Sequence, residues 1–241
     1  MTPFADAVAL LRKAERWLLP SACLLCQEPV GDADSDPLIC QLCLSRFRRL
    51  PEPCCNRCGQ PQAGAADPCR VCAAWPPAFG PVRSAVWLDD LARSAVHQLK
   101  YAGWPRVAES LARTMAPLLS TDLGAALVPV PLAPGRLRRR GYNQAERLAS
   151  ALSERAGLRL RGDLLVRVRD TRTQTALAPE ARQANVAGAF MKVGATEARV
   201  VLVDDVFTTG ATLVAAASTL LEAGAKRVGA VTFARAKPPI G

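Results

Sequence analysis

The chain has 241 residues, enough for one large domain or two unequal ones, and half of them are hydrophobic, which is ample for a buried core. No apolar run reaches the roughly eighteen residues that a membrane-spanning helix needs. The formal net charge is +10, and all of it lies after residue 80, because residues 1–80 hold eight basic and eight acidic residues. Such an excess is typical of a solvated basic surface or of a protein that binds a polyanion, either a diphosphate-bearing ligand or nucleic acid.

Residues 1–20 are expected to form a short amphipathic helix. Phe4, Val8, Leu11 and Leu18 fall at helical spacing. Four charged residues between positions 12 and 16 interrupt any apolar core, so the segment is not read as a signal peptide. We therefore expect a cytoplasmic protein whose cysteines are reduced.

Residues 21–75 carry four Cys-x-x-Cys pairs, which predict two zinc sites with four thiolates each rather than a disulfide framework. The pairs are Cys23/Cys26, Cys40/Cys43, Cys55/Cys58 and Cys69/Cys72. The simplest assignment joins the first pair with the second and the third with the fourth. A cross-braced assignment, first with third and second with fourth, is the alternative. Cys54 could replace Cys55, although Cys55 has the better spacing. With only thiolate ligands and no open position, the zinc is expected to be structural.

The composition shifts at 76–81, where the cysteine pairs end, and residues 80–241 are expected to form a second domain. Strands are predicted at 82–88 and 126–131, and helices at 89–101 and 104–119. Together with the later elements they predict an α/β domain, a parallel sheet flanked by helices.

Residues 128–149 (VPVPLAPGRLRRRGYNQAERLA) predict a strand, an irregular Pro-rich turn, a basic run and a helix that begins near Asn143. A strand end followed by a loop and a helix start forms the ligand-facing edge of a parallel sheet. The turn at Pro131 and Leu132 could expose backbone N–H groups. Four arginines could neutralise a diphosphate: Arg136, Arg138, Arg139 and Arg140. The alternative is a basic surface loop.

Residues 199–203 predict a buried strand, 211–223 a helix ended by Gly224, and 227–233 a further strand. Asp204 and Asp205 follow the first of these strands. The loop that comes next offers hydroxyl and N–H groups at a helix start, which suits an anion. Carboxylates beside such a loop suit a sugar phosphate. We also expect that Asp204 and Asp205 can both be replaced with alanine without leaving a partner group unpaired. The G-x-x-x-x-G-K-[ST] motif of P-loop ATPases is absent.

The segment VVLVDDVFTTGAT at 200–212 closely resembles the motif with which type I phosphoribosyltransferases bind 5-phosphoribosyl 1-diphosphate (PRPP). The resemblance implies that Asp204 and Asp205 contact the ribose hydroxyls and that Mg²⁺ accompanies the diphosphate. It also implies a set of residues that grip the 5′-phosphate: Thr208, Thr209, Gly210, Ala211 and Thr212.

Together with the cysteine pairs, the segments HQLKYAG, RRRGYNQAE and DTRTQTAL make residues 15–236 resemble the ComF family (ComFC/GntX-like), a double zinc ribbon joined to a type I phosphoribosyltransferase-like domain. The resemblance implies a role in DNA uptake during natural competence, with single-stranded DNA and competence proteins as partners. Residues implied to lie near the ligand are Lys100, Tyr101, Arg140, Asn143 and Gln144. Gln174 and Arg182 are implied to lie on a loop, 170–183, that closes over PRPP.

Two further expectations concern activity and DNA. Thr208 stands where purine-salvage phosphoribosyltransferases have an acid, and it cannot act as a base at neutral pH. PRPP binding is therefore expected, and transfer to an unidentified small acceptor is the alternative. The ribbon has few aromatic residues (Phe47, Trp75 and Phe79), which favours weak DNA contact dominated by arginine. A binding module that uses the sheet only as a scaffold is a third hypothesis.

Overall fold

The computed structural model describes residues 22–30, 38–62, 69–119, 126–169, 188–195 and 197–237. The expected N-terminal helix at 1–20, together with Gln174 and Arg182, lies outside these residues. None of the helices that are described is both long enough and apolar enough to cross a membrane.

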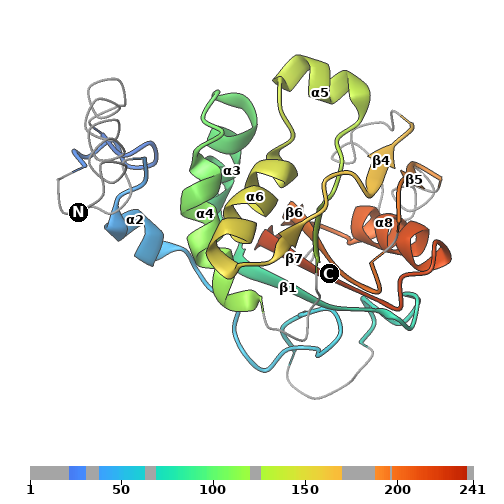
Figure 1. Cartoon of the computed structure of the whole chain (residues 1–241). Coiled ribbons are helices and arrows are strands. Elements are labelled where there is room, and N and C mark those ends of the chain that lie inside the picture. Colours follow the sequence, from blue (N-terminus) through green and yellow to red (C-terminus); the bar gives the residue numbers. More distant parts are fainter. Residues whose placement is uncertain are drawn as a thin grey trace, which may run out of the picture.

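Five parallel strands form the central sheet in the order β1-β7-β6-β2-β3 (Figure 1). They are β1 Phe79–Trp87, β2 Ala126–Pro129, β3 Arg159–Leu160, β6 Arg199–Phe207 and β7 Arg227–Arg235. The two central strands, β6 and β7, are nearly continuous runs of buried apolar residues, because helices cover both faces of the sheet. The expected parallel sheet flanked by helices is confirmed.

Helices and a small two-stranded sheet form the two outer layers (Figure 1). One face carries α3 (Asp90–Tyr101), α4 (Val107–Met115) and α6 (Gln144–Ala156). The other carries α8 (Ala211–Glu222) and the antiparallel pair β4 (Leu165–Arg167) and β5 (Phe190–Lys192). The helix predicted over 104–119 is shorter, and a 3₁₀ turn over Ala116–Leu118 follows α4. Pro117 accounts for the change at the C-terminal end, because it has no N–H to continue the helical hydrogen bonds.

Strand β6 is longer than the predicted 199–203. It remains paired with β7 to its end, so that Asp204 lies opposite Thr232 and Phe207 lies opposite Arg235. The two aspartates therefore lie within the strand rather than after it. Neighbouring aspartates are unfavourable in isolated strands, and here the pairing with β7 overrides that tendency.

The basic run is helical, which the sequence does not predict, whereas Pro131 and Leu132 before it lie in an irregular segment, as expected. Helix α5 (Pro134–Arg140) begins with a proline, whose missing N–H costs nothing in the first turn. Gly141 ends it in the left-handed conformation (φ +80°) and donates its N–H to the Leu137 carbonyl at 2.8 Å. Pro134 and Gly141 thus mark the two ends of this helix.

The cysteine-rich segment packs on the sheet in two places. Its first part, with α2 (Gln41–Arg46), shares a core with α3 and α4. There the Phe47 ring meets the Phe233 ring edge-on, with centroids 5.2 Å apart, and Gln98 donates to the Leu24 carbonyl at 3.3 Å. Its second part shares the core on the α8 face. Both parts are thus packed against the α/β domain.

Candidate functional site

A cleft of about 770 Å³ opens at the carboxyl edge of the sheet. Its walls come from the segments that follow β1 and β2, from the end of β6, and from α3, α5 and the start of α8. Its cationic side chains are Arg93, Lys100, Arg136, Arg139, Arg140 and Arg167, and its acids are Asp204 and Asp205. The excess of positive charge suits a ligand with several negative charges.

Asp205 is at the centre of a polar network in the cleft. Its Oδ2 pairs with the ammonium of Lys100, and its Oδ1 accepts a hydrogen bond from Gln144 Nε2 at 3.0 Å. The Gln144 amide oxygen in turn accepts a hydrogen bond from Arg140. Asp205 is only 2% exposed, and Lys100 comes from the last turn of α3. This corrects the expectation that both acids could be removed without leaving a partner unpaired.

The two neighbouring aspartates have opposite pKa shifts. Burial opposes the ionisation of Asp205, but the charge and hydrogen bond of Lys100 outweigh it and lower its pKa. Burial raises the pKa of Asp204 well above its ordinary value, and the charge of Asp205 adds to the effect. The pair thus consists of an ionised acid already paired with lysine and a half-buried acid that takes up a proton more readily.

Tyr101 and Arg140 form the rim of the cleft. The Tyr101 side chain is 68% exposed, and the Arg140 guanidinium lies over its ring, 5.0 Å from the centroid. His97, the only histidine of the chain, lies one helical turn earlier, with its ring centroid 5.3 Å from that of Tyr101. The rim therefore combines an exposed aromatic ring with cationic groups.

The Thr-Gly loop, residues 208–210, joins β6 to α8. Thr208 and Thr212 line the cleft, and the Thr209 hydroxyl accepts the Ala211 N–H at 3.4 Å. Gly210 has φ +81° and precedes the first helical residue. The loop places hydroxyl groups and the N-terminus of a twelve-residue helix at the cleft, which favours anion binding there.

Most of the residues predicted to bind ligand lie in this cleft: Lys100, Tyr101, Pro131, Leu132, Arg140, Gln144, Asp204, Asp205, Thr208 and Thr212. Four of the others adjoin it without lining it: Asn143, Thr209, Gly210 and Ala211. Asn143 caps α6 and bonds the Val130 carbonyl, while Arg138 is exposed on α5. Arg93 and Arg167 line the cleft but were not predicted, because nothing in their local sequence marks them.

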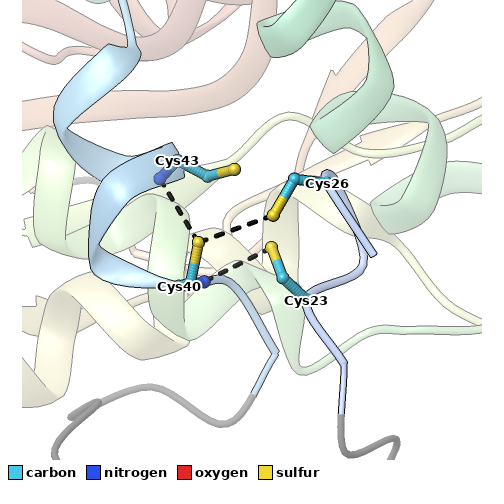
Figure 2. A group of neighbouring side chains, drawn as sticks. All are labelled: Cys23, Cys26, Cys40 and Cys43. Carbon is cyan, nitrogen blue, oxygen red and sulfur yellow. Dashed lines mark hydrogen bonds between the residues drawn. The ribbon is translucent and has the colours of Figure 1, made fainter. Parts of the chain in front are cut away.

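The first two cysteine pairs form one cluster. Figure 2 shows the thiols of Cys23, Cys26, Cys40 and Cys43 converging, and their sulfur atoms all lie within 4.8 Å of one another. The Cys26 and Cys40 sulfurs are 3.7 Å apart. A tetrahedral zinc site with Zn–S bonds of about 2.3 Å would hold its sulfurs about 3.8 Å apart. The geometry therefore fits a structural zinc ion.

The last two pairs form the second cluster, in which Cys55 lies 3.6 Å from Cys72 and Cys58 lies 3.4 Å from Cys69, between sulfur atoms. Cys54 is not part of this cluster, because its thiol points to the Glu52 carboxylate at 3.5 Å. Consecutive pairs thus share a cluster, and the cross-braced alternative is not the arrangement found. The sulfur spacing again suits structural zinc.

Family models match two separate segments of the chain. Residues 14–73 match a double zinc ribbon domain, and residues 137–239 match a phosphoribosyl transferase domain. The first match covers both cysteine clusters. The second covers most of α5, the aspartate pair and the Thr-Gly loop.

Curated relatives match most of the chain. DNA utilization protein YhgH of Salmonella typhimurium is 33% identical over 218 residues, which cover 87% of this chain and 95% of the relative. Competence protein ComFC of Bacillus subtilis is 28% identical over 78% of this chain and 80% of its own. Competence protein F of Haemophilus influenzae is 29% identical, and the match covers 82% of this chain and 90% of that protein. The chain therefore belongs to the ComF family, with a double zinc ribbon joined to a phosphoribosyltransferase-like domain.

Proposed function

We propose that the cleft binds PRPP. The observation that carries this proposal is the placement of an acid pair and the Thr-Gly loop in one cleft with the arginines of α5. The loop and the α8 N-terminus would hold the 5′-phosphate, and the arginines would face the diphosphate. Asp204 is better placed than Asp205 to accept from the ribose hydroxyls, because both oxygens of Asp205 already have partners.

Magnesium would enter with the ligand rather than bind to a site made by the protein alone. Among the described residues, the only groupings of three or more potential metal ligands are the two cysteine clusters. Mg²⁺ commonly binds through substrate phosphates with one or two carboxylates. The half-buried Asp204 carboxylate in the cleft could supply such a contact, and the ion would spread the charge of the diphosphate.

We also propose that the protein acts in DNA uptake and contacts single-stranded DNA. Its relatives are named competence proteins and a DNA utilization protein. The ribbon aromatics are buried, with Phe47 5%, Trp75 8% and Phe79 0% exposed, so they are not available to stack on bases. Tyr101 offers an exposed ring instead, beside cationic groups that could follow a phosphate backbone.

A smaller cleft extends the basic surface. It shares Leu88 and Arg93 with the main cleft and adds Arg48 and Lys237, beside the acidic side chains of Asp89 and Asp90. A single strand that crosses Tyr101 could therefore pass from α5 along α3. If it does, DNA and PRPP would use some of the same cations and should compete.

Calorimetric titration with PRPP and Mg²⁺ tests the first proposal, with Asp204→Ala as the site variant and the exposed Asp90→Ala as its control. We expect saturable binding that Asp204→Ala abolishes and Asp90→Ala preserves. Unchanged affinity in Asp204→Ala would contradict the ribose assignment.

Transfer to a small acceptor is a second candidate, because one wall of the cleft is apolar. Leu88, Val96 and Val206 lie there and could contact a flat acceptor. Exchange of labelled pyrophosphate into PRPP, with and without a panel of acceptors, separates an enzyme from a protein that only binds PRPP. Exchange or acceptor-dependent release of pyrophosphate is expected only for the enzyme.

A further inference from the structure

The Thr-Gly loop rests on two aromatic rings from distant parts of the chain. A Cβ atom at Gly210 would lie 2.9 Å from the Phe207 ring and 3.1 Å from the Trp75 ring. The centroids of these two rings are 6.2 Å apart. Phe207 ends β6, whereas Trp75 follows the last cysteine pair. Only a glycine lets the loop pass this close to both rings, because a side chain at position 210 would clash with them. The loop and the two rings are therefore packed directly against one another.

Arg235 ties Phe207 to the second cysteine cluster. Its guanidinium lies 4.0 Å from the centroid of the Phe207 ring and donates hydrogen bonds to the Cys58 carbonyl and the Gln60 Oε1, both at 2.9 Å. Arg235 is only 1% exposed. A buried guanidinium must keep its partners, because losing them leaves a charge without compensation.

Arg57 ties Trp75 to the same cluster. It lies between Cys55 and Cys58, and it donates to the Trp75 carbonyl at 2.8 Å and to the Cys72 carbonyl at 3.1 Å. The Trp75 N–H also bonds the Cys72 carbonyl at 3.1 Å. Both rings beneath the Thr-Gly loop are thus held from the backbone of the second cluster.

We propose that Arg235, Phe207 and Trp75 are positioning residues. They connect the Thr-Gly loop to the second cysteine cluster and thereby fix the position of the loop. Zinc at that cluster then governs the affinity of the cleft for a phosphorylated ligand, whereas zinc at the first cluster, which packs on the opposite face of the sheet, does not. The part of this inference that concerns PRPP affinity rests on the proposed function. The part that concerns the order of the loop does not.

The primary test compares Cys72→Ser with Cys43→Ser in the full chain, each expected to lose one zinc ion. Zinc content, PRPP affinity and hydrogen exchange of amides 207–213 are measured for both. We expect Cys72→Ser to lose about tenfold or more in affinity and to exchange faster at 207–213. Cys43→Ser should stay within about threefold of wild type, a difference of less than 1 kcal/mol. Equal losses in both variants, or unchanged exchange in Cys72→Ser, would overturn the proposal.

Arg235→Met tests the same link if Cys72→Ser does not fold. It keeps all cysteines, and Arg227→Met, at the exposed opposite end of β7, is its matched control. We expect Arg235→Met to retain two zinc ions but to weaken PRPP binding and speed exchange at 207–213, with partial recovery in Arg235→Lys. Unchanged exchange in Arg235→Met would contradict the link. If wild-type protein binds no PRPP, the proposed function fails alone, because the exchange comparison still decides whether the cluster orders the loop.

Discussion

Lys100 and Asp205 form an ion pair that joins the last turn of α3 to β6 inside the cleft. The two side chains are 21% and 3% exposed, so little water screens their charges. Burial opposes the charge of Lys100, yet the attraction of Asp205 prevails and raises its pKa. Both groups therefore stay ionised at neutral pH, and the pair fixes a cation beside Asp204.

Replacing Lys100 with methionine should destabilise the fold, because the buried Asp205 carboxylate would lose its counter-charge. We expect a loss of about 3–5 kcal/mol in the free energy of unfolding, measured by urea denaturation. Lys226→Met, at an exposed position, is the control and should change stability little. Adding Asp205→Asn to Lys100→Met should recover part of the loss. No recovery in the double variant would mean that the ion pair is not the cause.

Asp204→Asn should stabilise the protein at pH values above the ordinary pKa of an aspartate. The gain should grow as the pH rises towards the raised pKa of Asp204. Because burial raises the pKa of Asp204, the native state binds more protons than the unfolded state between these two values, and stability falls as pH rises through that window. Asparagine removes this penalty, so the gain should vanish at low pH.

Thermal melting of both proteins at several pH values measures the effect. Asp163→Asn is the control, and we expect it to change stability in the opposite direction, because a hydrogen bond from Arg161 lowers the pKa of Asp163. That variant should lose stability at neutral pH and not at low pH. If Asp204→Asn and the wild type had the same melting temperature at every pH, the ionisation of Asp204 would not destabilise the native state.

The edge of the sheet that holds the cleft could be predicted from sequence, because the pattern is local. An apolar run, two acids, a Thr-rich loop and a helix follow one another within residues 199–222. The cysteine pairs were predictable for the same reason, since spacing alone defines a zinc knuckle. The double zinc ribbon and the phosphoribosyltransferase-like domain are both confirmed by the family models.

Contacts between distant segments could not be predicted in this way. Arg235 and Cys58 are 177 positions apart, yet they are bonded through the guanidinium. Lys100 was singled out through the family resemblance, but no local pattern indicated that it neutralises Asp205. Helix α5 was missed because proline and glycine mark turns as well as helix ends. In each case the fold, rather than the neighbouring sequence, decides the outcome.

Metal analysis of protein purified without chelator should find about two zinc ions per chain, one for each cysteine cluster. Cys26→Ser and Cys58→Ser should each lower the zinc content by about one and loosen the segment that holds the altered cluster, because metal binding contributes folding free energy. Cys54→Ser is the control and should retain both ions, since the Cys54 thiol lies outside the second cluster. No bound zinc in the wild-type protein would contradict the assignment of both sites.

Single-stranded DNA should bind with an affinity that falls steeply with salt. Arg140 bonds Gln144 in the Asp205 network, so replacing Arg136 and Arg139, which also line the cleft, with alanine is a cleaner test than any variant that includes Arg140. Each lost phosphate contact should reduce the slope of log K against log salt by about 0.7. The control is Arg155→Ala with Arg227→Ala, two exposed arginines away from the cleft that change the net charge equally.

Tyr101→Ala separates stacking from charge on the same surface. Because it removes the exposed ring and keeps every cation, it should weaken DNA binding by about 1–3 kcal/mol without changing the salt slope. Tyr101→Phe should bind as the wild type does. Fluorescence anisotropy with a labelled oligonucleotide measures both quantities, and added PRPP should displace the DNA. Equal loss in the cleft and control arginine pairs would mean that the DNA contact is a non-specific property of the basic surface.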